Sequence, residues 1–372
     1  MTKKIRRHDL DWIRVLVFGL LIFYHVGMFY VPWGWHIKNE VILEWFQIPM
    51  VFINQWRLPI LFVVSGMGTW YALGYRSSGT YMKERLKRLG IPLIFGMLVI
   101  VPPQVFIERI TNDGYQFSYL HFLMNDAFTP VYPEGNLSWH HLWFLPYLLF
   151  YSLILTPLFI AIRRNKLNGL QSFVSSIIKT NWGIYLFIIP WYLCDAFMEP
   201  FFEVTLAFVG DWFTLTNYLF YFLAGFLLLS TGADWWQAVD RIKRKALIIG
   251  ILAFAVWLIR WNYIEDSTVV HFIESFVTVV NVWSWILAIF GFGAKYLNKP
   301  SGKLTYANRA VYPFYILHQT ITIIIAFYLL KIDLNIYVEV LILTIGTFLI
   351  TYLIYEFIIR RIKLLWPIFG LK

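Results

Sequence analysis

The chain has 372 residues, of which 59% are hydrophobic, 20% are aromatic and only 14% are charged. Soluble domains contain about 25% charged residues, so this composition excludes an ordinary soluble protein and predicts an integral membrane protein. The formal net charge is +10, yet the basic residues do not gather on a soluble module as nucleic-acid binding requires. We therefore expect no nucleic-acid partner. The single cysteine, Cys194, excludes an internal disulfide framework.

The first apolar run, Trp12–Val31, follows a basic start but lacks small-residue cleavage signals, so we interpret it as a retained transmembrane helix. A spanning helix needs about 20 mainly apolar residues. Ten segments fit, at approximately residues 12–31, 46–74, 91–108, 141–162, 183–198, 212–230, 246–262, 272–295, 310–330 and 337–359. The sequence predicts an all-α bundle of about ten transmembrane helices, forming a single domain over residues 1–372 with no appended soluble domain.

The distribution of lysine and arginine predicts the orientation of these helices. Of the 31 basic residues, 25 lie in alternate connections that include both termini, three lie in the other connections, and three lie within spans. By the positive-inside rule, both termini are predicted to be cytoplasmic, facing anionic lipid headgroups of the bilayer. The longest outer connection, residues 109–140, is long enough to cover a site as a lid.

Charged and titratable residues interrupt the first helix. Arg14 and His25 are eleven positions apart, so at 100° per residue they point within about 20° of each other and lie about 16 Å apart along the axis. Asp11 lies on the same stripe, about 40° to 60° away. An ionisable residue within a span costs about 2.5–3.5 kcal/mol and indicates function by default. The structural alternative is that Arg14 reaches the headgroups and His25 forms an interhelical hydrogen bond.

Further basic residues suggest a polar chamber and a phosphate grip. The second span contains "NQWR", which places Arg57 within an apolar segment at a depth similar to that of His25. Arg85 and Arg88 are three positions apart, so on an α-helix they share a face at the cytoplasmic mouth of the third span. Arginine suits phosphate because of its fork of donors, although topology alone also places basic residues there.

The remaining histidines do not predict a metal site. His140 and His141 are adjacent and would point about 100° apart on a helix, and no HExxH or CxxC pattern is present. We therefore expect no metal. His318 and Glu356 are weaker candidates, because each is more often a satisfied intramembrane hydrogen bond than a catalytic group.

Together these residues predict a transfer reaction across the membrane. An activated donor with an anionic head would bind from the cytoplasm, with its phosphates on Arg14, Arg85 and Arg88. The separation of about 16 Å is near the reach of the pantetheine arm of coenzyme A. His25 would act as general base or transient acyl acceptor, since imidazole titrates near neutral pH. The donor is then a co-substrate, and we expect no bound cofactor.

Four motifs in order give a family resemblance. Arg14-x10-His25, "FVVSG" (62–66), "RLKRLGIP" (85–92) and "HLWFL" (141–145) resemble the acyltransferase-3 membrane family. "HLWFL", "GIP", "YILHQTIT" and "YEFIIR" are similar to its glucans biosynthesis protein C branch.

The resemblance implies a ten-helix bacterial inner-membrane enzyme that moves an acyl group from cytoplasmic acetyl- or succinyl-coenzyme A to a carbohydrate outside, such as a periplasmic glucan. It implies that His25 is catalytic and that Arg14, Arg85 and Arg88 bind the donor. Any second-stage transferase would be a separate glycan-biosynthesis partner protein. The candidates for lining the site are Asp11, Arg57, Ser65, His141, Trp143 and His318.

Two other functions compete with this interpretation. A secondary transporter or flippase also suits ten spans with a polar intramembrane chamber, but it should show paired broken helices in related halves, and the sequence has no such internal symmetry. A structural or sensor protein would need an output domain, and no soluble domain is evident in the sequence.

Overall fold

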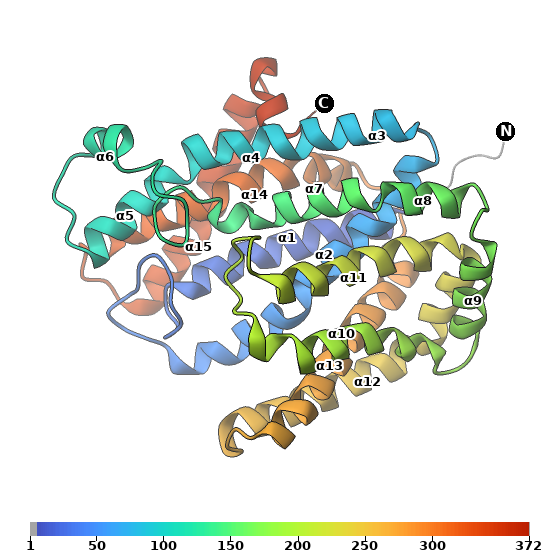
Figure 1. The fold of residues 1–372 in the computed structure, drawn as a ribbon. Coiled ribbons are helices and arrows are strands. Elements are labelled where there is room, and N and C mark those ends of the chain that lie inside the picture. Colours follow the sequence, from blue (N-terminus) through green and yellow to red (C-terminus); the bar gives the residue numbers. More distant parts are fainter. Residues whose placement is uncertain (1–5, 372) are drawn as a thin grey trace. The chain divides into compact units, whose positions relative to one another are not determined.

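The computed structural model describes residues 6–371. Over this range the chain forms helices and no strand; one isolated bridge joins Val131 and Leu137 (Figure 1). Among the described residues, eight helices are long and apolar enough to cross a membrane, or nine when one bent pair counts as a single span. The all-α, multi-pass prediction is therefore confirmed, whereas the number ten and the cytoplasmic termini stay predictions.

The spans differ from the expected ones in three places. The third is longer, because a helical run covers Ser78–Asn112. The fourth is bent by 50° between His140–Ile154 and Thr156–Arg163, where Pro157 supplies no backbone donor to the preceding turn. The seventh forms part of α12 (Ala233–Tyr263), which is not among the eight spanning helices.

The chain divides into two compact units that share several helices. Unit 1 comprises Met1–Val17, Asn54–Lys83 and Phe150–Leu304, and unit 2 comprises Phe18–Ile53, Glu84–Leu149 and Thr305–Lys372. The helices that contribute residues to both units are α1 (His8–Met28), α2 (Gln47–Leu73), α3 (Ser78–Arg85), α7 (Phe144–Ile154) and α14 (Gly302–Leu329). The expectation of one transmembrane domain stays a prediction.

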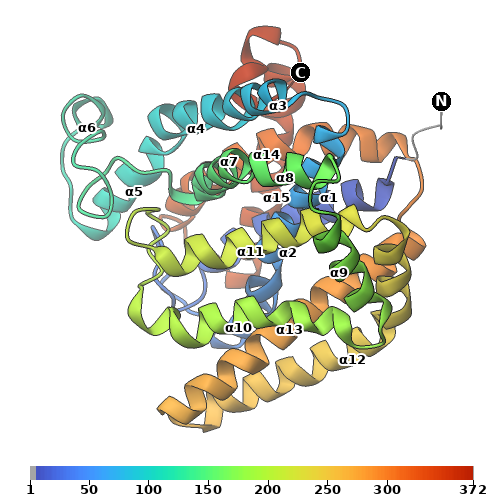
Figure 2. The same cartoon turned by 45° about the vertical axis from the view of Figure 1, so that its right-hand side comes forward.

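Unit 1 is built around close helix contacts. Its own helices are α8 (Thr156–Arg163), α9 (Asn168–Lys179), η5 (Gly183–Phe187), α10 (Ile188–Phe197), η6 (Glu199–Phe201), α11 (Trp212–Ser230), α12 and α13 (Thr268–Tyr296). Helices α12 and α13 run side by side as a hairpin (Figures 1 and 2). A Cβ at Gly66 of α2 would lie 2.0 Å from the carbonyl oxygen of Phe222, and one at Gly225 of α11 would lie 2.0 Å from that of Val63. The glycine of "FVVSG" therefore allows α2 to approach α11.

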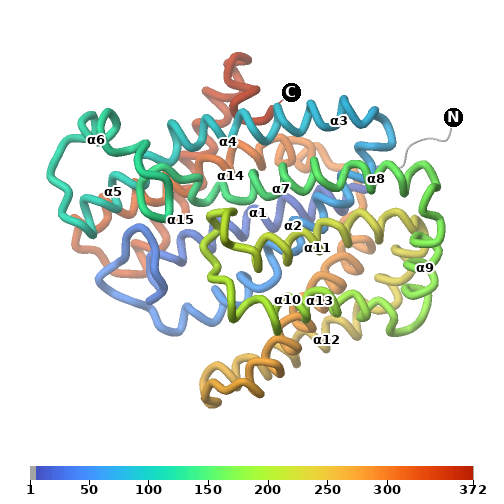
Figure 3. The backbone as a smooth tube through the Cα atoms, viewed as in Figure 1, coloured from blue at the N-terminus to red at the C-terminus, as the bar shows by residue number. Residues whose placement is uncertain are grey.

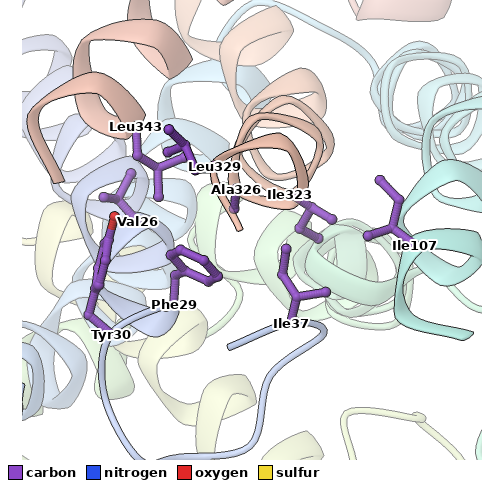
Figure 4. Close-up of a cluster of buried hydrophobic side chains, with 9 residues drawn as sticks. All are labelled: Val26, Phe29, Tyr30, Ile37, Ile107, Ile323, Ala326, Leu329 and Leu343. Atoms are coloured by element: carbon purple, nitrogen blue, oxygen red, sulfur yellow. The ribbon is translucent and has the colours of Figure 1, made fainter. Parts of the chain in front are cut away.

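Unit 2 contains the remaining helices and two long irregular segments. Its own helices are η1 (Glu44–Phe46), η2 (Leu86–Gly90), α4 (Ile91–Phe95), η3 (Gly96–Ile100), α5 (Pro102–Asn112), α6 (Tyr119–Asn125), η4 (His140–Trp143), α15 (Ile336–Leu353), η7 (Ile354–Ile359), η8 (Lys363–Leu365) and η9 (Pro367–Phe369). Irregular backbone follows α1 and flanks α6 (Figure 3). Nine buried side chains, among them Phe29, Ile37 and Ile323, hold the segment after α1 against α5, α14 and α15 (Figure 4).

Prolines follow two of the irregular helical turns of unit 2, η2 and η3. Pro92 lacks an N–H, which leaves the carbonyl of Arg88 without its helical donor; the hydroxyl of Tyr312 donates to that carbonyl at 2.9 Å. Pro102 and Pro103 follow the wide turn η3 in the same way. The backbone N–H of Gln104 donates to the carbonyl of Val101 at 2.8 Å, and the carbonyl of Ile100 accepts instead from the side chains of Thr320 at 2.7 Å and Gln104 at 3.4 Å. This brings polar groups into the interior.

Candidate active site

A pair of histidines forms the centre of the candidate site in unit 2. Nδ1 of His25, near the end of α1, lies 2.9 Å from Nε2 of His318 in α14. The ring centroids are 4.9 Å apart. His318 is fully buried, whereas His25 is only partly buried. His25 is thus the member of the pair that a substrate could reach.

The backbone determines which nitrogens carry hydrogen. Nδ1 of His318 faces the carbonyl oxygens of Phe314 at 3.1 Å and Tyr315 at 2.8 Å. A carbonyl only accepts, so Nδ1 carries the hydrogen, and Nε2 of the neutral ring is an acceptor. His25 must then donate from Nδ1, which leaves the lone pair on its Nε2. This is the tautomer that a general base or a nucleophile needs.

A third imidazole lies against this pair. The ring of His141, in η4, is perpendicular to that of His318 with centroids 5.3 Å apart. Its Nε2 donates to the carbonyl of Ile316 at 3.0 Å, and its own carbonyl accepts from the Tyr315 hydroxyl at 2.8 Å. His141 is therefore held by α14, the helix that holds His318.

Two buried glutamines connect this cluster to an imidazole–carboxylate pair, His36 and Glu108. Gln104 of α5 donates to Thr320 at 2.6 Å and lies 3.4 Å from Nδ1 of His141. Gln319 of α14 donates to Gln104 and to Nε2 of His36, each at 3.0 Å. His36 in turn bonds through Nδ1 to Glu108.

The segment after α1 also carries a partly buried amine. Lys38 donates to the carbonyl of Met28 at 2.5 Å. Burial of its side chain lowers the pKa of Lys38 to about 8. Nearby, Asn39 donates to the buried carboxylate of Glu339 at 2.6 Å. These contacts fix the segment that presents His36.

A basic pocket lies in unit 1. It has a volume of about 290 Å³ and is lined by Arg6, Arg7, Leu10, Asp11, Arg14, Val64, Gly68, Tyr71 and Tyr75. Asp11 pairs with Arg6 at 2.7 Å and with Arg14 at 3.0 Å. Arg7 pairs with buried Asp9 at 2.6 Å and lies over the ring of Trp236. Arg14 is thus part of a half-exposed cluster in which the positive charge exceeds the negative.

The Arg85–Arg88 pair has a different geometry from the expected one. Arg85 ends α3, and Arg88 lies in η2, a π-helical turn. The α-helical spacing that would put both on one face does not apply across this wider turn. The guanidinium of Arg88 approaches the carbonyl of Gly370 at 3.3 Å. The role of Arg85 and Arg88 in donor binding stays a prediction.

The other candidate residues have contacts within their own units. Arg57 is buried in unit 1 and donates to Asn54 at 3.1 Å; its shared chamber with His25 stays a prediction. The carbonyl of Ser65 accepts from Thr69 at 3.0 Å. Trp143 packs on Tyr147 within unit 2.

Glu356, the weakest candidate, lies in η7. It accepts a hydrogen bond from Tyr306 at 2.8 Å and pairs with Arg360 at 2.5 Å. These two contacts are typical of a structural role, which we considered commoner for such a residue than a catalytic one. Within residues 6–371, no group of three or more His, Cys, Asp or Glu side chains could hold a metal ion.

Comparison with known proteins now decides the family. The profile of the family described as "Acyltransferase domain" matches residues 7–356. This chain belongs to that family. The predicted resemblance to acyltransferase-3 proteins is therefore confirmed, and the chain is a multi-pass membrane acyltransferase, which favours this interpretation over a transporter.

Curated relatives support the same assignment. Glucans biosynthesis protein C of Escherichia coli (strain SMS-3-5 / SECEC) is 26% identical over 340 residues, which cover 87% of this chain and 84% of that protein. The protein of the same name from Escherichia coli (strain K12) is 25% identical over the same shares. No solved structure matches.

The sequence identified only part of the cluster. His25, His141 and His318 were candidates, and unit 2 brings all three together. His36, Gln104, Glu108 and Gln319 were not. Local signals pointed only to the two glutamines: Gln104 follows a Pro-Pro pair, and Gln319 is adjacent to His318.

Proposed function

We propose that this membrane acyltransferase moves an acyl group from cytoplasmic acyl-coenzyme A to a hydroxyl of an extracytoplasmic glycan, with His25 as the general base. The observation that carries the proposal is the contact between His25 and His318. His318 donates to two backbone carbonyls and therefore accepts from His25. The lone pair on Nε2 of His25 then takes the proton of the acceptor hydroxyl.

The reaction follows from this proton transfer. As Nε2 of His25 gains the hydroxyl proton, the hydroxyl oxygen attacks the thioester carbonyl. The C–S bond then breaks, and the coenzyme A thiolate leaves and takes the proton from Nε2 of His25, which returns to its neutral form. The positive charge on His25 is shared with His318 through their hydrogen bond. In the alternative path, Nε2 attacks the thioester first and passes the acyl group on.

The basic pocket of unit 1 supports an anionic donor. Arg6, Arg7 and Arg14 outnumber the single carboxylate that lines it, and Tyr71 and Tyr75 offer aromatic surface. Guanidinium groups bind phosphate bidentately, and aromatic rings stack on a nucleobase. α1 is continuous from His8 to Met28, so Arg14 and His25 lie about 16 Å apart along it, near the reach of a pantetheine arm.

The acyl group and acceptor are proposed by analogy with the relatives. Their name, glucans biosynthesis protein C, supports a periplasmic glucan as acceptor, the bacterial inner membrane as location, and other glycan-biosynthesis proteins as partners. Succinyl and acetyl groups are the two acyl groups we would test. Arg85 and Arg88 are proposed to assist donor binding at the cytoplasmic side.

The test uses inside-out membrane vesicles that contain the full chain. Labelled acetyl- or succinyl-coenzyme A is added outside, and label is followed into a lumenal oligosaccharide pool. We expect transfer with the wild type and with His271→Ala, a control histidine in unit 1 that bonds to the carbonyl of Ala196, but not with His25→Ala. Intact, inserted wild-type protein that transfers neither label would overturn the proposal.

A further inference from the structure

The short helix α6, in the long connection that follows α5, packs against α5 itself. Both helices belong to unit 2, and α6 lies beside the end of α5 in both views (Figures 1 and 2). The rings of Tyr119 and Phe122 in α6 lie 5.1 Å and 5.5 Å from the ring of Phe106 in α5. Phe122 is fully buried. The face of α6 that carries Phe122 is therefore the one turned to α5.

The depth of Phe106 in the membrane follows from the charges around it. α5 is the last part of the helical run Ser78–Asn112, which is long and apolar enough to cross a membrane. Within this run, residues 89–107 carry no charge, and Arg88 and Glu108 stand at their two ends. At 1.5 Å per residue this stretch covers about 28 Å, close to the thickness of the hydrocarbon core, about 30 Å.

Phe106 thus lies where the hydrocarbon meets the headgroups, and so does the helix packed on it. Tyrosines are enriched at this level of a bilayer. Two of them, Tyr115 and Tyr119, have their rings 6.1 Å and 5.1 Å from that of Phe106. The sequence predicts the connection 109–140 as an outer lid, but α6 lies at the level of the membrane surface rather than above it.

The opposite face of α6 is apolar and exposed. At 100° per residue, Leu120 and Met124 each point about 160° away from Phe122. They are 64% and 76% exposed, and neither side chain has a hydrogen-bond donor. The polar residues His121 and Asn125 lie together on one flank of the helix. We call Leu120 and Met124 the apolar arc of α6.

The charged groups beside α6 have partners within the same connection. The hydroxyl of Tyr115 donates to Asp126 at 2.5 Å, and Arg109 pairs with Asp113 at 2.6 Å. An occupant of the apolar arc therefore need not supply a charge. A sugar is a poor match, because the arc offers no group to bond its hydroxyls, whereas hydrocarbon at this depth is already present.

We propose that α6 is an interfacial helix whose apolar arc lies in the acyl chains of the leaflet at which α5 ends. The partner of this surface is the bilayer, and with cytoplasmic termini the leaflet is the outer one. Amphipathic helices of this kind bury their apolar face about 5–10 Å into the boundary between headgroups and acyl chains. The proposal concerns a binding surface and does not depend on the reaction at His25.

Hydrogen bonds connect the proposed anchor to the candidate site. The side-chain amide of Asn136 donates to the carbonyl of Asp126 at 3.1 Å, directly after α6. Its oxygen accepts from Arg109 of α5 at 2.9 Å. Asn136 lies shortly before η4, which carries His141. The lipid contact thus fixes the start of the segment that leads to the histidine cluster.

The single cysteine of the chain allows a direct test by spin labelling. Cys194 is free and buried, so Cys194→Ala gives a background in which each new cysteine is the only one. Nitroxide labels are attached singly at Leu120→Cys, Met124→Cys and Asn125→Cys, and the protein is reconstituted in phosphatidylcholine bilayers. Asn125, exposed on the polar flank, is the matched control. Leu98→Cys is the lipid-facing reference, since Leu98 is 47% exposed within the third span.

Collisions with oxygen, which concentrates in hydrocarbon, are compared with collisions with a water-soluble nickel chelate. We expect the labels at Leu120 and Met124 to report a depth of about 5–10 Å and to favour oxygen, as the label at Leu98 does. The label at Asn125 should favour the chelate. The proposal fails if the labels at Leu120 and Met124 meet the chelate as often as the label at Asn125.

The same labels detect other occupants of the arc. If a second copy covers it, labels at Leu120 broaden one another's spectra, and dilution with unlabelled protein removes the broadening. If a glycan covers it, the label at Leu120 meets the chelate until a neutral oligoglucan is added and then becomes immobile. Either result would replace the lipid assignment. No donor or turnover enters these measurements, so protein without transfer activity retains the anchor and contradicts only the proposed function.

A charged variant gives a second, independent readout. Leu120→Asp with Met124→Asp puts two carboxylates into the arc, which should drive α6 out of the lipid and speed amide hydrogen exchange across Tyr119–Asn125 about fivefold in bilayers. Asn125→Asp adds a carboxylate on the polar flank and should leave exchange unchanged. Equal exchange in the double variant and in the wild type would show that the arc does not lie in lipid.

Discussion

The basic pocket of unit 1 and the histidine cluster of unit 2 handle polar groups in opposite ways. In the pocket, the side chains of Arg6 and Arg14 are 54% and 39% exposed, and they share the carboxylate of Asp11. In the cluster, His318 and Gln104 are fully buried, and their partners are imidazoles, an amide, a hydroxyl and backbone carbonyls.

This difference reflects what each region would have to do. A site that exchanges a highly charged donor with water keeps its arginines accessible, where pairing is weak and a ligand can replace the carboxylate. A site that moves one proton needs neighbours that stay neutral, since a buried uncompensated charge is expensive. Substitutions in the pocket should therefore weaken donor binding, whereas substitutions in the cluster should slow the chemical step.

The largest effect should come from removal of the base. We expect His25→Ala to lower the rate of transfer by about 10²- to 10⁴-fold, the usual contribution of a positioned acid or base, with unchanged insertion and donor binding. The measurement is the initial rate in vesicles together with equilibrium binding of labelled acyl-coenzyme A. A comparable loss of donor binding would show that His25 acts in donor binding rather than in the chemical step.

The next largest effect concerns the residue behind the base. His318→Phe keeps a ring of similar size but removes the acceptor for Nδ1 of His25. We expect a loss of about 10²-fold in the chemical step with little change in the donor concentration at half-maximal rate. Because His318 is fully buried, thermal unfolding must be measured alongside, and His271→Phe serves as the control. A higher half-saturating donor concentration with an intact maximal rate would contradict the role.

The sequence predicted most of the spans, because a run of apolar residues is a local property of the chain. It did not predict the approach of α2 to α11, which the glycine at position 66 allows. The bend near Leu155 and the π-helical turn at Arg88 were missed, although Pro157 and Pro92 were visible. A proline removes a donor, but whether the helix then bends or recruits a group such as the Tyr312 hydroxyl depends on the neighbouring helix.

The contacts of the two buried glutamines, Gln104 and Gln319, were not predictable, for a related reason. Gln104 contacts Gln319 and Thr320, residues more than 200 positions away. An isolated glutamine in an apolar run has no periodicity and no required spacing, so its role appears only when its hydrogen-bond partners are known. His318 was recognisable as an intramembrane titratable residue, but its partnership with His25 spans 293 positions.

A smaller effect is expected in the basic pocket. Arg14→Ala should raise the donor concentration at half-maximal rate by about three- to tenfold, less than for a buried charge because the guanidinium is exposed and screened. Asp11→Asn should do the reverse, by about twofold, since it removes the carboxylate that competes with the donor. Both effects should diminish with added salt. Weaker donor binding in Asp11→Asn would show that the carboxylate orients the arginine instead.

The smallest effect should appear at Lys38 in unit 2. Partial burial of this lysine favours its neutral amine over its charged form. Burial lowers the pKa of Lys38 to about 8, against about 10.4 for an exposed lysine. Between these values the unfolded chain binds more protons than the folded one, so this residue makes folding more favourable as pH rises through that window. Amine-selective labelling read by mass spectrometry should reach half of its maximal rate at Lys38 near pH 8. If labelling at Lys38 shows no half-maximal rate near pH 8, the segment after α1 does not exclude water from this amine, and the proposed contrast between the cluster and the charged pocket loses its support there.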